Sequence, residues 1–291
     1  MQSESAKHDT STERIDAHQH FWRIGRGDYG WLTKADHPKI ARDFLPDDLA
    51  PLLARARIDK TILVQAAPTE AETAFLLELA APFVAGVVGW VDFEGADAAA
   101  RIARLCANPK LLGLRPMIQD IPDNAWLLRP ALAPVFEAMR RGALRFDALV
   151  KPRHLPALAE FLARNPELAV VIDHGAKPDI AGHGIDLWAG YIRHIASNSR
   201  ACCKLSGLAS EAGPGWRVET LKPYVDVLLG TFGPSRLMWG SDWPVLNEVG
   251  DYARWLDAAE TLTAELSGAE RAAIFGGSAA SFYGLDDNAR A

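Results

Sequence analysis

Short apolar runs alternate with amphipathic stretches along most of the chain. Eight runs have the character of β-strands, at 14–18, 61–65, 83–91, 111–116, 144–150, 168–173, 202–207 and 236–242. Stretches with helical periodicity lie between and after them, at 46–56, 70–81, 97–106, 131–141, 155–165, 187–197, 218–230, 251–265 and 269–283. Strands that alternate with helices in this way are typical of βα units around a parallel sheet.

The number of these units and the length of the chain favour one closed barrel. Eight strand–helix units within 291 residues fit a (β/α)8 TIM barrel, which typically takes about 250 residues. The one Gly-x-Gly-x-x-Gly after a predicted strand, at 25–30, neither follows the strand at 14–18 directly nor opens the helix at 46–56, which argues against a doubly wound nucleotide-binding sheet. We therefore predict a single α/β domain over 14–291, preceded by a polar, disordered or fraying arm at 1–13.

Composition narrows the possible partners. The net charge is −6 without a basic cluster, so we expect neither nucleic acid nor an anionic membrane as a partner. The first residues lack the features of a secretory signal, and no apolar run is long enough to span a bilayer, so we expect a cytoplasmic protein. Cys106, Cys202 and Cys203 show no CxxC spacing, and we interpret them as reduced core residues.

The first predicted strand ends in two histidines spaced by one residue, His18 and His20. Side chains alternate along a strand, so both imidazoles should point to the same side, which at a barrel mouth can be the lumen. Imidazole is a common ligand of zinc-like ions. This pair by itself is equally compatible with one histidine capping a loop and the other packing in the core.

Two other strand ends also carry groups suited to chemistry. His174 follows the sixth apolar run and precedes a glycine, which suits a site that needs close approach. Asp242 ends the eighth run between Trp239 and Trp243, where its carboxylate could serve as a general base. An ordinary core histidine and a capping aspartate remain the alternatives for each residue taken alone.

Polar or aromatic residues near further strand ends are candidates for substrate binding: Arg115, Lys151, His154, Gln65 and Trp31. The guanidinium of Arg115 suits a carbonyl or carboxylate, or else a salt bridge across the mouth. Lys151 and His154 could donate to substrate oxygens, although His154 could instead cap the following helix. Gln65 could bind hydroxyl groups of a ligand, and Trp31 could pack against a ligand ring or simply under its own loop.

Taken together, these motifs resemble the amidohydrolase superfamily, and within it the amidohydrolase-related group that includes sugar lactonases. The resemblance runs from about Arg14 to Leu285 and includes the HxH pair, IDH at 172–174, GSDWP at 240–244, FDALVKPRHLP at 146–156 and the closing GGSAASFYGL. It implies that His18, His20, His174 and Asp242 form the catalytic set or the metal site.

Two departures from the superfamily pattern bear on the metal. Better-known members place a bridging Lys or Glu at the fourth strand and a His at the fifth, where this chain has Arg115 and Asp147. The resemblance therefore implies one divalent metal, zinc or a dispensable ion, rather than a two-metal centre. Relatives usually carry Asn at the position of Ser278, and we expect that change to be structural.

The resemblance implies a hydrolase that opens a sugar lactone, an aldonolactone such as L-fuconolactone, to the aldonic acid. Asp242 would act as general base, and the small-molecule lactone would be the partner. A zinc-dependent decarboxylase of the same superfamily is one alternative, and a non-catalytic sugar-binding barrel is another. The sequence leaves open whether the chain forms a homo-oligomer.

Overall fold

The structure is a computed structural model that describes residues 13–79 and 81–285. Its eight strands are β1 (Ile15–Gln19), β2 (Lys60–Val64), β3 (Val84–Gly89), β4 (Leu111–Leu114), β5 (Arg145–Ala148), β6 (Val170–Ile172), β7 (Cys202–Leu205) and β8 (Leu237–Trp239). Every one lies within or beside a strand predicted from the sequence. Of the predicted arm at 1–13, all but Glu13 lies outside the described residues.

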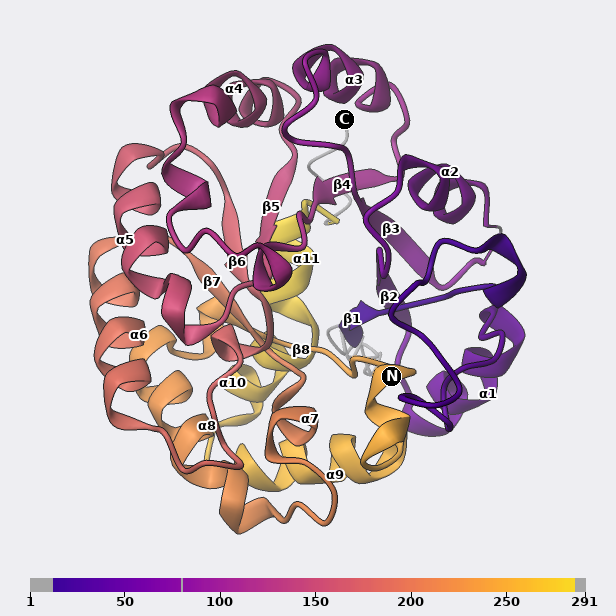
Figure 1. The fold of residues 1–291 in the computed structure, drawn as a ribbon. Coiled ribbons are helices and arrows are strands. Elements are labelled where there is room, and N and C mark those ends of the chain that lie inside the picture. Colours follow the sequence, from indigo (N-terminus) through magenta and orange to yellow (C-terminus); the bar gives the residue numbers. More distant parts are fainter. Residues whose placement is uncertain (1–12, 80, 286–291) are drawn as a thin grey trace, which may run out of the picture.

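The strands form one parallel sheet in the order of the sequence, from β1 to β8. Gln19 and Trp243 form a parallel bridge between the two edges, and the backbone N–H of Asp242 donates to the carbonyl of His18 over 2.8 Å. The sheet therefore closes into a barrel at the carboxyl ends of β1 and β8. The predicted TIM-barrel architecture is confirmed, with the strands inside a ring of helices (Figure 1).

Nine helices follow the strands around the outside of the barrel: α1 (Pro46–Ala56), α2 (Glu70–Glu78), α3 (Ala98–Leu105), α4 (Ala133–Arg141), α5 (Leu155–Arg164), α6 (Asp186–Asn198), α7 (Leu208–Ala212), α8 (Val218–Phe232) and α9 (Tyr252–Leu262). The sequence predicted all of these except α7. That helix has only five residues, too few for a helical period to stand out from the chain around it.

The last predicted helix, 269–283, is divided in the structure. It consists of α10 (Gly268–Ala272), a π-helical turn at Ala273–Gly277 and α11 (Ser278–Tyr283). A Cβ on Gly276 would lie 1.9 Å from the carbonyl oxygen of Glu13, so only glycine lets the chain before β1 approach this turn. The side chain of Tyr283 belongs to the apolar cluster inside the barrel.

The interior of the barrel is divided into an apolar part and a polar part. Buried side chains from six strands and from α11 form the apolar cluster: Ile15, Ala17, Ile62, Val64, Val88, Leu112, Val171, Met238, Ala279 and Tyr283. Charged side chains lie toward the carboxyl ends of the strands, where active sites of this architecture are found. A separate, larger cluster packs the sheet against the outer helices.

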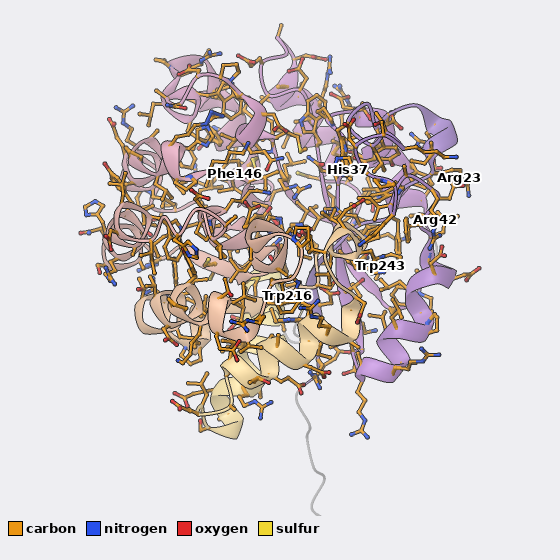
Figure 2. All side chains as sticks on the ribbon, turned by 60° about the horizontal axis from the view of Figure 1, so that its bottom comes forward. Arg23, His37, Arg42, Phe146, Trp216 and Trp243 are labelled. Atoms are coloured by element: carbon orange, nitrogen blue, oxygen red, sulfur yellow. The ribbon has the colours of Figure 1, made fainter. Side chains whose placement is uncertain are left out.

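A long loop between β1 and α1 crosses to the far edge of the sheet. Phe44 of this loop packs edge-on against Trp243 with ring centroids 5.2 Å apart, and Lys39 donates to the carbonyl of Glu248 over 2.7 Å. The neighbouring positions of Arg42 and Trp243 show the same approach (Figure 2). The loops after β1 and β8 are thus joined beside the mouth. No helix among residues 13–79 and 81–285 is long and apolar enough to cross a bilayer.

Candidate active site

The two histidines of the first strand lie together at the barrel mouth. Ile15 and Ala17 pack inside the barrel, whereas the carboxylate of Asp16 faces outward and accepts a hydrogen bond from Tyr252 of α9. Strict alternation would place His18 on the same outer side as Asp16. The register between β1 and β2 shifts between Asp16 and Gln19, which accounts for the change of face. The rings of His18 and His20 lie 4.9 Å apart.

His174 reaches the same place from an unusual turn of backbone. Residues 174–177 all have left-handed conformations, with φ of 54°, 59°, 62° and 52°. Such angles are costly for residues other than glycine and tend to persist where a functional geometry requires them. The hydroxyl of Ser206 lies 2.8 Å from Nδ1 of His174, and the two rings of His174 and His18 are 4.4 Å apart.

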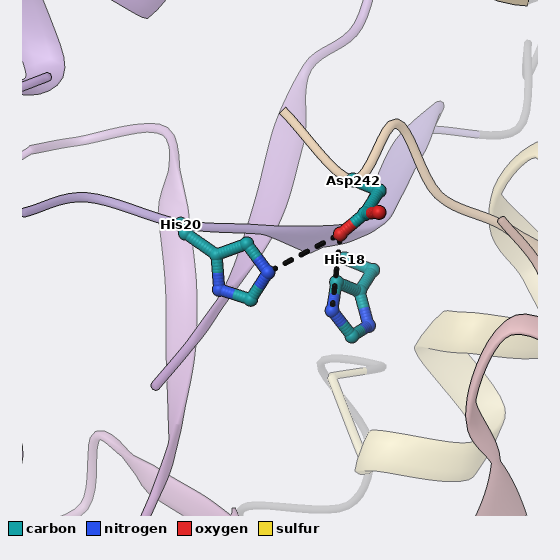
Figure 3. A group of neighbouring side chains, drawn as sticks. All are labelled: His18, His20 and Asp242. Carbon is teal, nitrogen blue, oxygen red and sulfur yellow. Dashed lines mark hydrogen bonds and ion pairs between the residues drawn. The ribbon is translucent and has the colours of Figure 1, made fainter. Parts of the chain in front are cut away.

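Asp242 completes the group from the loop after β8. It also has a left-handed backbone, with φ of 58°. Its Oδ1 lies 3.3 Å from Nε2 of His20, 3.8 Å from Nε2 of His18 and 3.9 Å from Nε2 of His174. Figure 3 shows His18 and His20 facing this carboxylate. Four side chains from three distant parts of the sequence therefore converge on one point.

The protonation states in this group follow from burial and from near neighbours. Burial by itself would raise the pKa of Asp242, but electrostatic attraction to the surrounding imidazoles, that of His174 above all, outweighs it and holds this pKa below its usual value. Burial lowers the pKa of His174 to about 4. Near neutral pH the site therefore contains an ionised carboxylate and a neutral His174.

The geometry of His20 tests whether a metal ion fits here. Nδ1 of His20 lies 2.8 Å from the carbonyl oxygen of Val64, which can only accept, so Nδ1 carries the ring proton. In a neutral ring, Nε2 then directs a lone pair at Asp242, and two acceptors face each other at 3.3 Å. A cation between them removes this conflict. The separation of 3.3 Å between His20 and Asp242 also suits a tetrahedral ion, whose ligand atoms lie roughly 3.3–3.6 Å apart, whereas those of 3.8 Å for His18 and 3.9 Å for His174 are slightly longer. The His and Asp side chains therefore fit a metal site.

A carboxylate that the sequence did not point to supports His18 from behind. Asp16 is fully buried and accepts from the backbone N–H groups of Ser241, over 2.8 Å, and His18, over 3.1 Å. The hydroxyl of Tyr252 donates to its other oxygen over 2.9 Å. Burial raises the pKa of Asp16 to about 6. Asp16 thus joins β1 to the loop that carries Asp242.

Four further charged side chains form a buried cluster that adjoins His18: Arg115, Asp147, Asp173 and Lys204. Arg115 donates through NH1 to Asp173 over 3.4 Å and places the same nitrogen 3.3 Å from Nε2 of His18. Sequence reasoning named Arg115 and Asp147 but missed Lys204 and Asp173. A lysine inside an otherwise apolar parallel strand, CCKL, was the available signal, because such strands are buried on both faces.

The group forms the floor of a cavity of about 590 Å³. The described residues that line it are His20, Asp28, Gly30, Trp31, His37, Ala66, Pro68, Arg115, Met117, Gln119, Asp120, Leu149, His174, Lys177, Asp242 and Val245. Fully buried His18 lies behind this lining. His37, which sequence reasoning gave no role, is part of the wall.

Of the five residues expected to bind substrate, two line this cavity and three do not. Arg115 and Trp31 are part of its lining, as far as the described residues form it, whereas Gln65, Lys151 and His154 are outside that lining. Nδ1 of His154 accepts from the backbone N–H of Lys151 over 3.0 Å, a capping contact. Gln65 donates to the carbonyl of Arg115 over 2.6 Å, so it holds the arginine backbone.

Comparison with known proteins agrees with this fold. The chain is 47% identical over 281 residues to an L-fucono-1,5-lactonase of Burkholderia ambifaria, covering 94% of this chain and 97% of the relative. It is 38% identical to an L-fucono-1,5-lactonase of Burkholderia multivorans, covering 96% and 98%. A crystal structure of an amidohydrolase from Burkholderia multivorans with bound zinc superposes with a TM-score of 0.88 at 38% identity, covering 94% and 99%. Residues 15–285 match the amidohydrolase family, and the chain therefore belongs to it.

Proposed function

We propose that this protein hydrolyses the ester bond of a sugar lactone and releases the aldonic acid, with L-fucono-1,5-lactone as the first candidate substrate. One observation carries the proposal: Nε2 of three histidines converges on the carboxylate of Asp242 at the floor of a cavity. The site lies in a chain that shares 47% of its residues with an L-fucono-1,5-lactonase over nearly its whole length.

The cavity suits a small polyhydroxylated ring. Its volume of about 590 Å³ is within the usual range for small-molecule sites. Asp28, Gln119 and Asp120 offer groups that can bond to hydroxyls, and Trp31 offers an aromatic face. The indole N–H of Trp31 donates to the carbonyl of Ala66 over 2.9 Å, which fixes the ring in the cavity wall.

Lactone opening requires a base, a donor to the carbonyl oxygen and a proton for the leaving oxygen. The ionised carboxylate of Asp242 takes a proton from water as the water oxygen bonds to the carbonyl carbon. Arg115 donates to the carbonyl oxygen as negative charge develops there, a role worth about 3–4 kcal/mol for a well-placed donor. Asp242 then gives the proton to the ring oxygen as the bond between that oxygen and the carbonyl carbon breaks.

The metal in this proposal is zinc. The candidates for its ligands are Nε2 of His18, His20 and His174 and the carboxylate of Asp242, of which His18, His20 and Asp242 form one group of possible ligands and His174 lies close to the same carboxylate. A histidine ligates only through a nitrogen without a proton. When bound there, zinc would polarise the lactone carbonyl as a Lewis acid. Elemental analysis of the purified protein, followed by activity before and after chelation, tests whether the ion is present and whether it is needed.

A panel of aldonolactones tests the function, with acid release followed by an indicator in weak buffer. L-Fucono-1,5-lactone is expected to turn over, and Asp242→Asn is expected to bind it with little turnover. The absence of turnover above background on every lactone would remove the lactonase proposal. Release of carbon dioxide from an aromatic acid would support the decarboxylase alternative, and binding without turnover by the parent protein would support the sugar-binding barrel.

A further inference from the structure

Asp28 places a carboxylate in the wall of the cavity, on the loop between β1 and α1. Its side chain is 10% exposed and forms an ion pair with Arg26, whose Nε–H donates to Oδ2 over 2.9 Å. The hydroxyl of Thr69 donates to Oδ1 over 2.9 Å. Asp28 is therefore a largely buried carboxylate whose charge is balanced within the protein.

Helix α2 holds both partners of this carboxylate in place. Thr69 caps the start of α2, and its oxygen accepts from the backbone N–H of Glu72 over 3.0 Å, so its one proton is directed to Asp28. The guanidinium of Arg26 lies over the ring of Phe75, 4.6 Å from the ring centroid. The two oxygens of Asp28 are thus fixed before a ligand binds.

The carboxylate of Asp28 retains acceptor capacity on its cavity side. An ionised carboxylate can only accept, and its two oxygens offer about four lone-pair sites. Arg26 and Thr69 occupy one site on each oxygen. Neither of them belongs to the cavity lining that the described residues form, whereas Asp28 does. A site on each oxygen is left for a ligand, and the ligand must supply the protons.

We propose that Asp28 is a specificity-determining residue, whose two oxygens accept hydrogen bonds from two adjacent hydroxyl groups of the ligand. The identity of that ligand rests on the proposed function. In a sugar 1,5-lactone the C2 hydroxyl lies beside the reacting carbonyl at the floor, so the adjacent pair farther away is on C3 and C4. Trp31, on the same loop and in the same lining, offers an aromatic face to the C–H groups of the ring.

This arrangement selects ligands by the protons they can donate. A ligand with fluorine, an O-methyl group or a carboxylate at these positions presents an acceptor to the acceptor of Asp28. A largely buried polar group left without its partner is costly, which is how sites that bond to a substrate hydroxyl reject analogues without it. The wall therefore favours neutral polyhydroxylated lactones over lactones that carry anionic groups at these carbons.

Asp120 also lines the cavity but is less suited to this role. It is exposed, and its Oδ2 accepts from the neighbouring side chain of Gln119 over 3.3 Å. An exposed carboxylate is hydrated, so a ligand hydroxyl there replaces a hydrogen bond from water with little net gain. Asp28, held by two partners and largely removed from water, gains more from a ligand that donates to it.

Calorimetric titration with L-fucono-1,5-lactam measures binding apart from turnover, since this probe has N–H in place of the ring oxygen and resists opening. We expect the parent protein to bind the lactam about 10–100-fold more tightly than its 3-deoxy-3-fluoro and 4-deoxy-4-fluoro analogues. Asp28→Ala should weaken binding of the lactam by a similar factor and leave the two analogues nearly unaffected. Equal losses for all three probes would show that Asp28 merely holds its loop, and would overturn the proposal.

Two further variants complete this test. Asp28→Asn keeps the shape of the side chain and replaces one acceptor by a donor, so it should lose discrimination against at least one fluoro analogue; unchanged discrimination would contradict the proposal even if Asp28→Ala does not fold. Asp36→Ala is the matched control, because Asp36 is on the same loop and accepts from the hydroxyl of Thr33 over 2.7 Å, outside the lining formed by the described residues. Its affinity for each probe should equal that of the parent.

Binding and turnover together separate this inference from the proposed function. If no lactone is turned over but binding of the lactam depends on Asp28, the lactonase proposal fails and the role of Asp28 stands. If lactones are turned over and Asp28→Ala keeps the parent's preference among the probes, the role of Asp28 fails and the lactonase proposal stands. A parent protein that does not bind the lactam also overturns that role. On a lactone substrate, Asp28→Ala should raise KM by about 10–100-fold with a smaller change in kcat, because these bonds form alike in the ground state and the transition state.

Discussion

Glu72 of α2 offers a test of how the wall of the cavity is held. Its side chain is fully buried. Oε2 accepts from the backbone N–H groups of Ala66, over 3.1 Å, and Ala67, over 2.8 Å, directly after β2. The carbonyl of Ala66 in turn accepts from Trp31. Glu72 therefore links an outer helix to the segment that positions an aromatic wall of the site.

The Glu72→Gln variant is expected to change the pH dependence of stability. Burial raises the pKa of Glu72 from 4.5 to about 7, so between these values the folded protein binds more protons than the unfolded chain. The free energy of unfolding should therefore fall as pH rises through this range and become flat above it. This rise in the pKa of Glu72 corresponds to roughly 3 kcal/mol of unfolding free energy. Glutamine keeps an oxygen that can accept from both N–H groups but cannot ionise. The variant should therefore lack this fall in the free energy of unfolding as pH rises.

Urea denaturation of the parent and of Glu72→Gln at pH 5 and pH 8 measures the effect. We expect similar stabilities at pH 5 and a more stable variant at pH 8, by up to roughly 3 kcal/mol. Glu78→Gln is the matched control, since Glu78 is an exposed glutamate of the same helix. The reasoning fails if the difference between parent and Glu72→Gln is the same at both pH values.

Three further outcomes follow from the site. Asp242→Asn should lower kcat on a lactone by about 100–10,000-fold with KM nearly unchanged, as steady-state kinetics would show. Gly207→Ala should reduce activity sharply, because its Cβ would lie 2.6 Å from Cγ of His174 at a backbone φ of +67°; a crystal structure of the variant with an unmoved ring would contradict this. Arg115→Lys should lose about 10–1,000-fold in kcat, since an ammonium lacks the planar donor pair; full activity in that variant would exclude the proposed oxyanion role.

Much of the fold could be predicted because its signals are local. Short apolar runs and helical periodicity located all eight strands and most helices, and the match is close where residues such as Pro46 mark an end, as for α1 at Pro46–Ala56. The residues at the strand ends followed from the rule that parallel strands of a barrel carry their chemistry at one rim. His18, His20, His174 and Asp242 could be named on that basis, before any distance between them was available.

Other features depend on neighbours that are remote in the sequence. The register shift in β1 turns His18 toward the mouth, and the run of left-handed residues at 174–177 places His174, but neither leaves a pattern that periodicity can detect. Lys204 and Asp16 appear as isolated polar residues in apolar strands. Their partners come from other strands and from α9.

The sequence by itself determined the number and order of the strands and helices and the types of side chain at the barrel rim, because each of these features depends on a few neighbouring residues. Only the tertiary structure decided which nitrogen of each histidine faces the carboxylate and which charges lie sealed beneath it. Those outcomes depend on hydrogen-bond donors and acceptors brought together by closure of the barrel between β1 and β8, residues that are more than 200 positions apart in the chain.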